Sequence, residues 1–337
     1  MTNITTQTTT LARERTGGEK SSPPERVSKR PKRRNANLGD ATFKIVTQIF
    51  AFLVFALVFV MAFEMFRGSE DSIKKFGWSF LTNTVWDPVK DEYGALVFVF
   101  GTVVSSLLAL FLALPLSIGV AIFLSEFAPR WLERPVSFVI ELLAAIPSIV
   151  YGLWGIFVLV PWLRTSVEPA LSKNLGFLPF FEGAPYGFGM LAAGIILAIM
   201  VIPIITSISR DVLRAIPTAQ REAALALGAT RWETTKIVLS DGKSGLLGAT
   251  LLGLGRAVGE TMAVTMVIGN RPEISASLLA PGYTMASVIA NEFAEATSKL
   301  YTSSLIELAL LLFVITVLLN AVARIIVWST TKKFTTA

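Results

Sequence analysis

The sequence has no cysteine and no histidine among its 337 residues, and only 16% of its residues are charged. Without cysteine the chain can form no disulfide and no thiolate metal ligand. Without histidine it lacks the commonest metal ligand and the usual general base. These absences exclude zinc hydrolysis and histidine-based triads, and we expect no catalytic residue and no metal site in this chain.

What the sequence does have is apolar: 53% of its residues are hydrophobic, and the mean hydropathy is +0.62. An ordinary soluble domain is about one quarter charged. Several apolar runs reach the ~20 residues that a helix needs to cross a bilayer. We therefore predict an all-α integral membrane protein with about six transmembrane helices, at about 44–66, 96–124, 136–163, 188–208, 246–269 and 304–327.

Residues 1–41 differ from the rest because they are rich in Thr, Ser, Pro, Glu, Lys and Arg. Such a composition buries too little surface to offset the entropy of ordering, which predicts a disordered basic tail before a membrane domain at 42–337. Its basic run could bind nucleic acid, but its place just before an apolar run favours a cytoplasmic anchor, with no nucleic acid as partner. The run comprises Lys29, Arg30, Lys32, Arg33 and Arg34.

Orientation follows from the distribution of Lys and Arg between the two sides of the expected spans. With the N-terminus inside, the interior segments hold 21 of these residues and the exterior loops hold 8; Arg256, inside the fifth span, completes the 30. Positive charge marks the cytoplasmic side. We therefore place both termini, and the long polar segment at about 209–245, in the cytoplasm.

This polar segment has the signals of two helices joined at a glycine. Pro217 suits a first helical turn, the run to Leu227 has high helical propensity, and Gly228 suits a left-handed C-terminal cap. Thr230 and Glu233 form a capping-box pattern, which predicts that a second short helix starts at once.

The same segment resembles the coupling loop of the inner-membrane permeases of ABC importers. The residues that match their pattern are Glu222, Ala223, Ala224, Gly228, Ile237 and Leu239. Two departures are that eight residues rather than nine separate Gly228 from Ile237, and that Ser240 stands where the family has proline. The resemblance implies a type I ABC importer permease fold whose cytoplasmic coupling helices dock on a separate ATPase. Without it, a surface-lying amphipathic helix pair with no partner would explain the pattern equally well.

The chain does not carry its own ATPase motif. Gly242, Lys243 and Ser244 imitate the end of a phosphate-binding loop, but Ile237 stands where that loop needs its first glycine, and no strand precedes it. We expect a junction between loop and membrane here and no cofactor in this chain, with ATP and Mg²⁺ bound by the ATPase subunit.

Arg256 and Glu260 lie four residues apart, which would place them on one face of a helix inside the fifth span. Each charge costs at least about 2.5 to 3.5 kcal/mol to insert there. One interpretation is structural: the two form an ion pair, and the neighbouring glycines pack. The other interpretation is that Arg256 attracts an oxyanion on a substrate path. Glu260 would then hold Arg256 in place or accept a hydrogen bond from a protonated anion. Glu141 could pair with Arg256 or with a basic loop residue.

The surrounding segments, residues 253–264, 265–270 and 144–155, closely resemble PstC-type permeases of phosphate-specific ABC importers. In that family an Arg and a Glu at the positions of Arg256 and Glu260 are implicated in phosphate movement. The resemblance implies ATP-driven import of inorganic phosphate across a bacterial inner membrane. It also implies three partners: a homologous second permease subunit, two copies of an ATP-binding subunit, and an extracytoplasmic phosphate-binding protein.

Three alternatives remain open at this stage. An ion-coupled anion carrier or channel would use Arg256 and Glu260 for anion and proton without an ATPase. An ABC permease could carry another oxyanion such as sulfate or molybdate. A purely structural membrane scaffold is the third alternative, but such a role gives no reason to keep the charged residues Arg256 and Glu260 inside a span.

Overall fold

The computed structural model describes residues 38–332, so the predicted tail and its basic run lie almost entirely outside the described residues. The first helix, α1 (Leu38–Gly68), begins slightly before the predicted end of the tail at residue 41. The chain divides into two units, residues 1–56 and 57–337, and the second contains all helices that follow α1.

Six helical segments in the described range are long and apolar enough to cross a membrane, as predicted. Apart from two isolated β-bridges, the regular structure of this range is helical. Five of the spans are long helices: α1, α4 (Leu96–Ile122), α9 (Met190–Ala215), α11 (Arg231–Gly259) and α14 (Lys299–Lys332). The remaining span, Ser148–Leu175, consists of three short helices, α6 (Ser148–Trp154), α7 (Val160–Trp162) and α8 (Glu168–Leu175). Two π-helical turns, Gly155–Leu159 and Leu163–Val167, join them.

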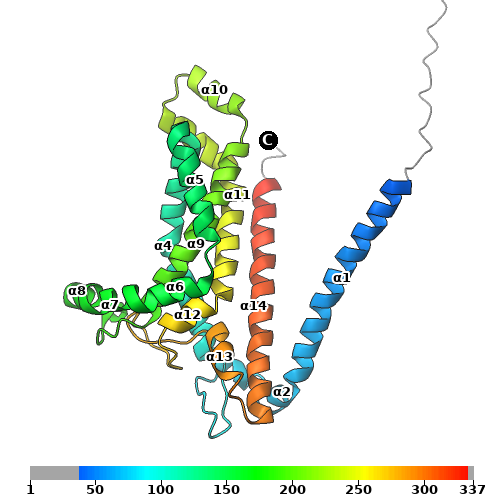
Figure 1. Ribbon diagram of the computed structural model, residues 1–337, viewed down its shortest axis with the longest axis vertical. Helices are drawn as coiled ribbons and strands as arrows, with labels where there is room; N and C mark the ends of the chain where they lie inside the picture. Colours follow the sequence, from blue (N-terminus) through cyan, green and yellow to red (C-terminus); the bar gives the residue numbers. More distant parts are fainter. Residues whose placement is uncertain (1–37, 333–337) are drawn as a thin grey trace, which may run out of the picture. The chain divides into compact units, whose positions relative to one another are not determined.

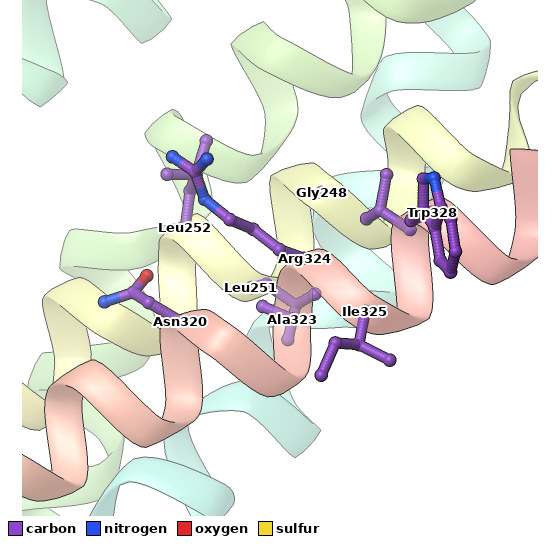
Figure 2. Close-up of a pocket in the computed structure, with 9 residues that line it drawn as sticks. Gly248, Leu251, Leu252, Asn320, Ala323, Arg324, Ile325 and Trp328 are labelled. Atoms are coloured by element: carbon purple, nitrogen blue, oxygen red, sulfur yellow. The ribbon is translucent and has the colours of Figure 1, made fainter.

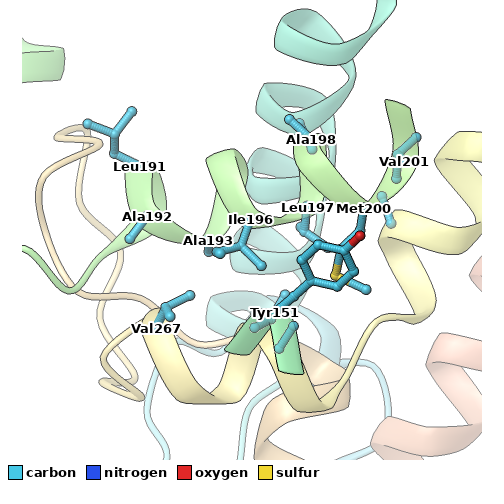
Figure 3. Close-up of a cluster of buried hydrophobic side chains, with 14 of the residues drawn as sticks. Tyr151, Leu191, Ala192, Ala193, Ile196, Leu197, Ala198, Met200, Val201 and Val267 are labelled. Atoms are coloured by element: carbon cyan, nitrogen blue, oxygen red, sulfur yellow. The ribbon is translucent and has the colours of Figure 1, made fainter. Parts of the chain in front are cut away.

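Helix α9 is the most buried of the six spans and forms the centre of the larger unit. It packs against α4 and α11, and its own residues Ile196, Leu197 and Val201 belong to the buried apolar cluster at this contact (Figure 3). Small residues permit the close approach: a Cβ on Gly194 would lie 2.5 Å from Leu108 of α4, and one on Gly253 would lie 2.6 Å from Ile205. Close helix packing through small residues is the usual solution inside a membrane.

The predicted third span, 136–163, is wrong as a single helix. Helix α5 (Arg130–Ala144) ends just before Pro147, which precedes the first residue of α6. The residue before a proline disfavours the α conformation, and proline donates no backbone hydrogen bond, so the helix stops there. The apolar segment continues beyond the predicted end to Leu175, and in Figure 1 α6 to α8 run across the direction of α9 and α11.

The polar segment and the fifth span also differ from the prediction. The second helix of the polar segment is not short, because α11 runs without a break from Arg231 to Gly259. Glycines inside it lower helical propensity by about 1 kcal/mol each. Packing of Gly245 against Val212 and of Gly253 against Ile205 compensates for this loss. The fifth span then stops at Gly259, ten residues before its predicted end, and α12 (Met262–Val267) follows.

At the opposite end of the unit from α10 (Thr218–Ala226), an aromatic cluster ties the loop after α3 (Ser79–Thr82) to α13 (Met285–Glu292) and α14. Trp86 Nε1 donates to a Glu292 carboxylate oxygen at 2.8 Å, and the Tyr301 hydroxyl donates to the same oxygen at 2.7 Å. Tyr93 stacks on Tyr301 with ring centroids 5.5 Å apart. Helix α2 (Glu70–Phe76) closes the same end against α14.

Candidate functional site

Arg256 and Glu260 do meet, as their spacing predicts, with Arg256 Nη2 lying 3.7 Å from Glu260 Oε2. The helix nevertheless ends between them, because Glu260 has extended backbone angles of φ −72° and ψ 128°. Its carboxylate accepts a hydrogen bond from the Ala263 N–H at 3.3 Å. Glu260 therefore stands at the junction of two helices, with its charge next to the positive N-terminal end of α12.

The two side chains differ in exposure. The Arg256 side chain is 42% exposed, whereas that of Glu260 is 6% exposed. A Cβ built on Gly255 or Gly259 would meet no atom within 4 Å, and Met262 is 54% exposed. The side of the chain that carries the Arg256 guanidinium is thus uncovered. Glu260 faces the protein interior and contacts this guanidinium from the buried side.

The predicted coupling residues lie on α10 (Thr218–Ala226) and the turn that follows it. Gly228 has a φ of 85° and ends the helix as predicted: its N–H donates to Leu225 O, and the Ala229 N–H donates to Ala224 O. This is a Schellman motif. The Thr230 and Glu233 capping box that opens α11 is also present.

Helix α10 is exposed to the solvent along most of its length. Glu222 and Ala223 are exposed, whereas Ala224 is buried. Leu225 is 51% exposed and Leu227 is 90% exposed. These two leucines were not singled out from the sequence, although a leucine on each side of Ala226 in a polar segment could have marked them. Together the four exposed residues form a mixed apolar and acidic surface suited to a partner.

Arg221 joins α10 to the body of the protein. Its guanidinium binds Glu126 with Nε 3.1 Å from Oε2 and Nη2 2.8 Å from Oε1, and it donates to the carbonyl oxygens of Leu213 and Ile216. Such a bidentate pair fixes geometry as well as charge. Glu126 lies in the π-helical turn Phe123–Phe127 after α4, and its local sequence gives no sign of this long-range contact.

Two further arginines hold the same end of α9 to neighbouring helices. Arg210 Nη2 lies 3.2 Å from Glu141 Oε1 and Arg214 pairs with Glu133. Glu141 therefore pairs with a basic residue near the polar segment and not with Arg256. These two pairs join α5 to α9, and the pair of Arg221 with Glu126 joins α10 to the turn after α4.

The Gly242, Lys243 and Ser244 triplet lies within the long helix α11. A Cβ on Gly242 would contact Leu213 and Ile216, so this glycine packs against the end of α9. A phosphate-binding loop needs a free run of backbone N–H groups, which a continuous helix does not offer. The triplet is therefore part of the helix, and the predicted junction between loop and membrane is wrong.

Two cavities stand out in the described range, and Arg256 lines neither. The first, of about 670 Å³, lies between α11 and α14 (Figure 2). The second, of about 540 Å³, lies beside the end of α12 and is lined by Arg164, Tyr186 and Asn270 among others. The open side at Arg256 is a surface of the single chain and not an enclosed pocket.

Comparison with known proteins agrees with this arrangement. Residues 113–331 match the family described as the binding-protein-dependent transport system inner membrane component. A structure of the MetNI methionine ABC transporter in an inward-facing conformation shares the fold, with a TM-score of 0.52 and 19% identity over 73% of this chain and 99% of that chain. The fold and the family match thus define an inner membrane component of a binding-protein-dependent transport system.

More similar relatives narrow the assignment. The chain is 49% identical to the phosphate transport system permease protein PstC of Haemophilus influenzae over 86% of this chain and 93% of that protein. It is 48% identical to PstC of Mesorhizobium japonicum over 90% and 94%, respectively. The chain belongs to the PstC family of transport permeases.

Proposed function

We propose that the chain is the membrane permease subunit of an ATP-driven phosphate importer in the bacterial inner membrane. The observation that carries the proposal is the Arg256 guanidinium, half-exposed on an uncovered side of α11 and held by the buried Glu260 at 3.7 Å. The names of the PstC relatives support phosphate as the cargo. An intramembrane charge of this kind is a functional candidate by default.

The two residues divide the recognition of the anion between them. A guanidinium presents five N–H donors in a planar fork, which suits a tetrahedral oxyanion. Glu260 keeps this cation in place and is itself held by the Ala263 N–H. A carboxylate accepts but does not donate, so it also favours an anion that carries a proton, as hydrogen phosphate does at neutral pH.

Coupling to ATP hydrolysis is assigned to α10. Glu222, Ala223, Leu225 and Leu227 are the exposed surface for a separate ATPase subunit, present in two copies, which would bind ATP and Mg²⁺. Arg221 and Glu126 fix α10 to the membrane body. Helix α11 starts next to this unit and carries Arg256 in its last turn, so a helix of about 40 Å can transmit a movement at α10 to the anion site.

The other proposed partners are a second permease subunit and an extracytoplasmic binding protein. A homologous second permease subunit would cover the uncovered side of α11 at Gly255, Gly259 and Met262, so that the path lies between the two subunits. An extracytoplasmic phosphate-binding protein would deliver the anion. The excess of Lys and Arg on the side of α10 supports a cytoplasmic location for α10 and for both termini.

The test is uptake of labelled phosphate by cells that lack their own high-affinity system and express the chain with its partner subunits. At equal membrane abundance, we expect Arg256→Gln to abolish uptake and still to assemble with the ATPase. Arg271→Gln is the matched control, because Arg271 is an exposed arginine that pairs with Glu273 away from the site.

Three results would contradict the proposal. Unchanged uptake by Arg256→Gln would remove Arg256 from the path and leave the charge pair structural. Uptake by purified chain that needs a proton gradient and no ATP would favour an ion-coupled carrier. Sulfate or molybdate that competes with phosphate at equal concentration would reopen the identity of the cargo.

A further inference from the structure

The cavity of about 670 Å³ between α11 and α14 is an open groove whose walls are mostly apolar. Leu251 and Leu252 line it from α11, and Ala323, Ile325 and Val327 line it from α14. Leu252 is 57% exposed and Ile325 is 62% exposed, so the apolar walls are uncovered. A surface of this kind inside a membrane-spanning region can accept an acyl chain.

Two polar side chains of α14 enter this apolar groove. Asn320 and Arg324 are four residues apart on one face of α14, and Figure 2 shows Arg324 extending from α14 toward Leu252 of α11. Asn320 donates to the Thr316 carbonyl at 2.9 Å. No carboxylate within the described residues, 38–332, forms an ion pair with Arg324. The groove thus contains a cation to which the described part of the chain offers no counter-charge.

Arg324 lies near the C-terminal end of the span Lys299–Trp328, and Figure 1 shows this end of α14 on the side where α10 lies. Trp328, which is 60% exposed and lines the same groove, lies four positions after Arg324. That spacing is a rise of about 6 Å, and tryptophan is enriched where the bilayer core meets the headgroups. An arginine one turn before such a tryptophan can extend its charged end to the headgroup level.

We propose that this groove binds an anionic phospholipid of the cytoplasmic leaflet, with Arg324 on the lipid phosphate and one acyl chain along Leu251, Leu252 and Val327. The side of the membrane rests on the orientation assigned under the proposed function. A purely apolar helix of a partner subunit would instead bury Arg324 without a counter-charge, which is costly inside a membrane. Basic pockets between transmembrane helices on this side are known to suit anionic headgroups.

The experiment is native mass spectrometry of the full chain purified with its partner subunits, after addition of phosphatidylglycerol or phosphatidylcholine. We expect phosphatidylglycerol to be retained in preference to phosphatidylcholine. Arg324→Gln should lower its apparent affinity by about fivefold, the contribution of one basic residue near an anionic membrane surface, and Arg324→Lys should largely restore it. Leu252→Trp, which fills the exposed groove, should reduce retention as well.

Lys299→Gln is the control, because it removes a positive charge from the opposite end of the same helix. Equal retention of the two lipids by the wild type, or unchanged retention by Arg324→Gln, would overturn the proposal. Displacement of bound phosphatidylglycerol by millimolar inorganic phosphate would also overturn it, since the ligand of Arg324 would then be the free anion. Lipid retention does not depend on transport, so a failed uptake test with Arg256→Gln would leave this result standing.

Discussion

Arg256 lies in the last turn of α11 and Glu260 lies just beyond the end of that helix, yet their side chains form an ion pair of 3.7 Å. Because the helix ends before Glu260, the Glu260 carboxylate contacts both the Arg256 guanidinium in α11 and the Ala263 N–H in the first turn of α12. The charge pair therefore joins two helices. Any movement of α12 relative to α11 changes the position of the Arg256 guanidinium.

Replacing Glu260 by Gln should uncouple this junction. The amide oxygen of Gln can still accept from the Ala263 N–H, but the charge that holds Arg256 is lost. A misplacement of about 1 Å of a positioning group can cost on the order of 100-fold in rate, so we expect phosphate uptake to fall by about tenfold or more at equal abundance. The double variant with Arg256→Gln should lose no more than the worse single variant, and additive losses would show that the two residues act independently.

Arg221→Ala should destabilise the chain, whereas Glu222→Ala should not. Arg221 is 18% exposed and Glu126 is 9% exposed, and breaking a buried pair leaves one charge uncompensated, at a cost of up to about 3 to 5 kcal/mol. Glu222 is exposed, and surface changes usually stay within about 0.5 kcal/mol. Thermal unfolding in detergent measures the difference.

Binding of the ATPase subunit gives the complementary measurement for this pair of residues. We expect Glu222→Ala to weaken it while leaving the unfolding temperature unchanged. If Glu222→Ala bound the ATPase like the wild type, the exposed face of α10 would not be the docking surface. If Arg221→Ala unfolded at the wild-type temperature, the contact with Glu126 would contribute nothing to stability.

Gly253 and Gly255 should respond in opposite ways to alanine. A Cβ on Gly253 would lie 2.6 Å from Ile205 Cγ1 and 2.7 Å from Val201 Cγ1. Overpacking of this kind costs about 1 to 3 kcal/mol, so Gly253→Ala should lower the unfolding temperature. Gly255 has no atom within 4 Å of its added Cβ, so Gly255→Ala should gain up to about 1 kcal/mol of helical propensity. Equal shifts in the two melting curves would contradict the observed packing of α11 on α9.

Alkaline pH should destabilise the aromatic cluster through Tyr93. Burial, together with the nearby Asp91 carboxylate, raises the pKa of Tyr93 from 10.0 to about 12. Between these values the folded chain binds more protons than the unfolded chain, so stability is intact below pH 10 and falls as pH rises toward about 12. Unfolding curves at about pH 9 and about pH 11 should show this loss.

Tyr93→Phe keeps the ring and removes the ionising hydroxyl, so it should make the unfolding temperature less sensitive to pH in this window. Tyr186→Phe is the control, because Tyr186 is 52% exposed. A pH dependence that is the same in Tyr93→Phe and in the wild type would assign the alkaline loss to other groups.

The helical elements were largely predictable from sequence because their signals are local. Apolar runs of sufficient length identified the six spans, and the Gly228 cap and the Thr230 and Glu233 capping box were both confirmed. Boundaries were less predictable. The break at Pro147 was missed because proline is also tolerated inside membrane helices, as Pro115 is in α4 and Pro203 is in α9.

The candidate site was predictable in its residues but not in its geometry. Spacing placed Arg256 near Glu260, and the resemblance to ABC importer permeases placed Glu222 and Gly228 in the coupling loop. It could not show that α11 would end at Gly259, nor that Glu126, ninety-five residues before Arg221, would bind it. The roles of Arg256, Glu260 and the α10 residues stay predictions that the uptake and binding experiments test.

The sequence by itself determined that this protein is helical and lies in a membrane, because hydropathy, length and capping act within a few turns of chain. It also determined that Arg256 is a cation inside a span, because an arginine within an apolar run is recognised from the sequence alone. Only the tertiary structure decided which side of each helix is covered, which charges neutralise one another and where α11 stops. These depend on neighbours that are distant in the chain, and in a close-packed interior their shapes select among the conformations that local propensity allows.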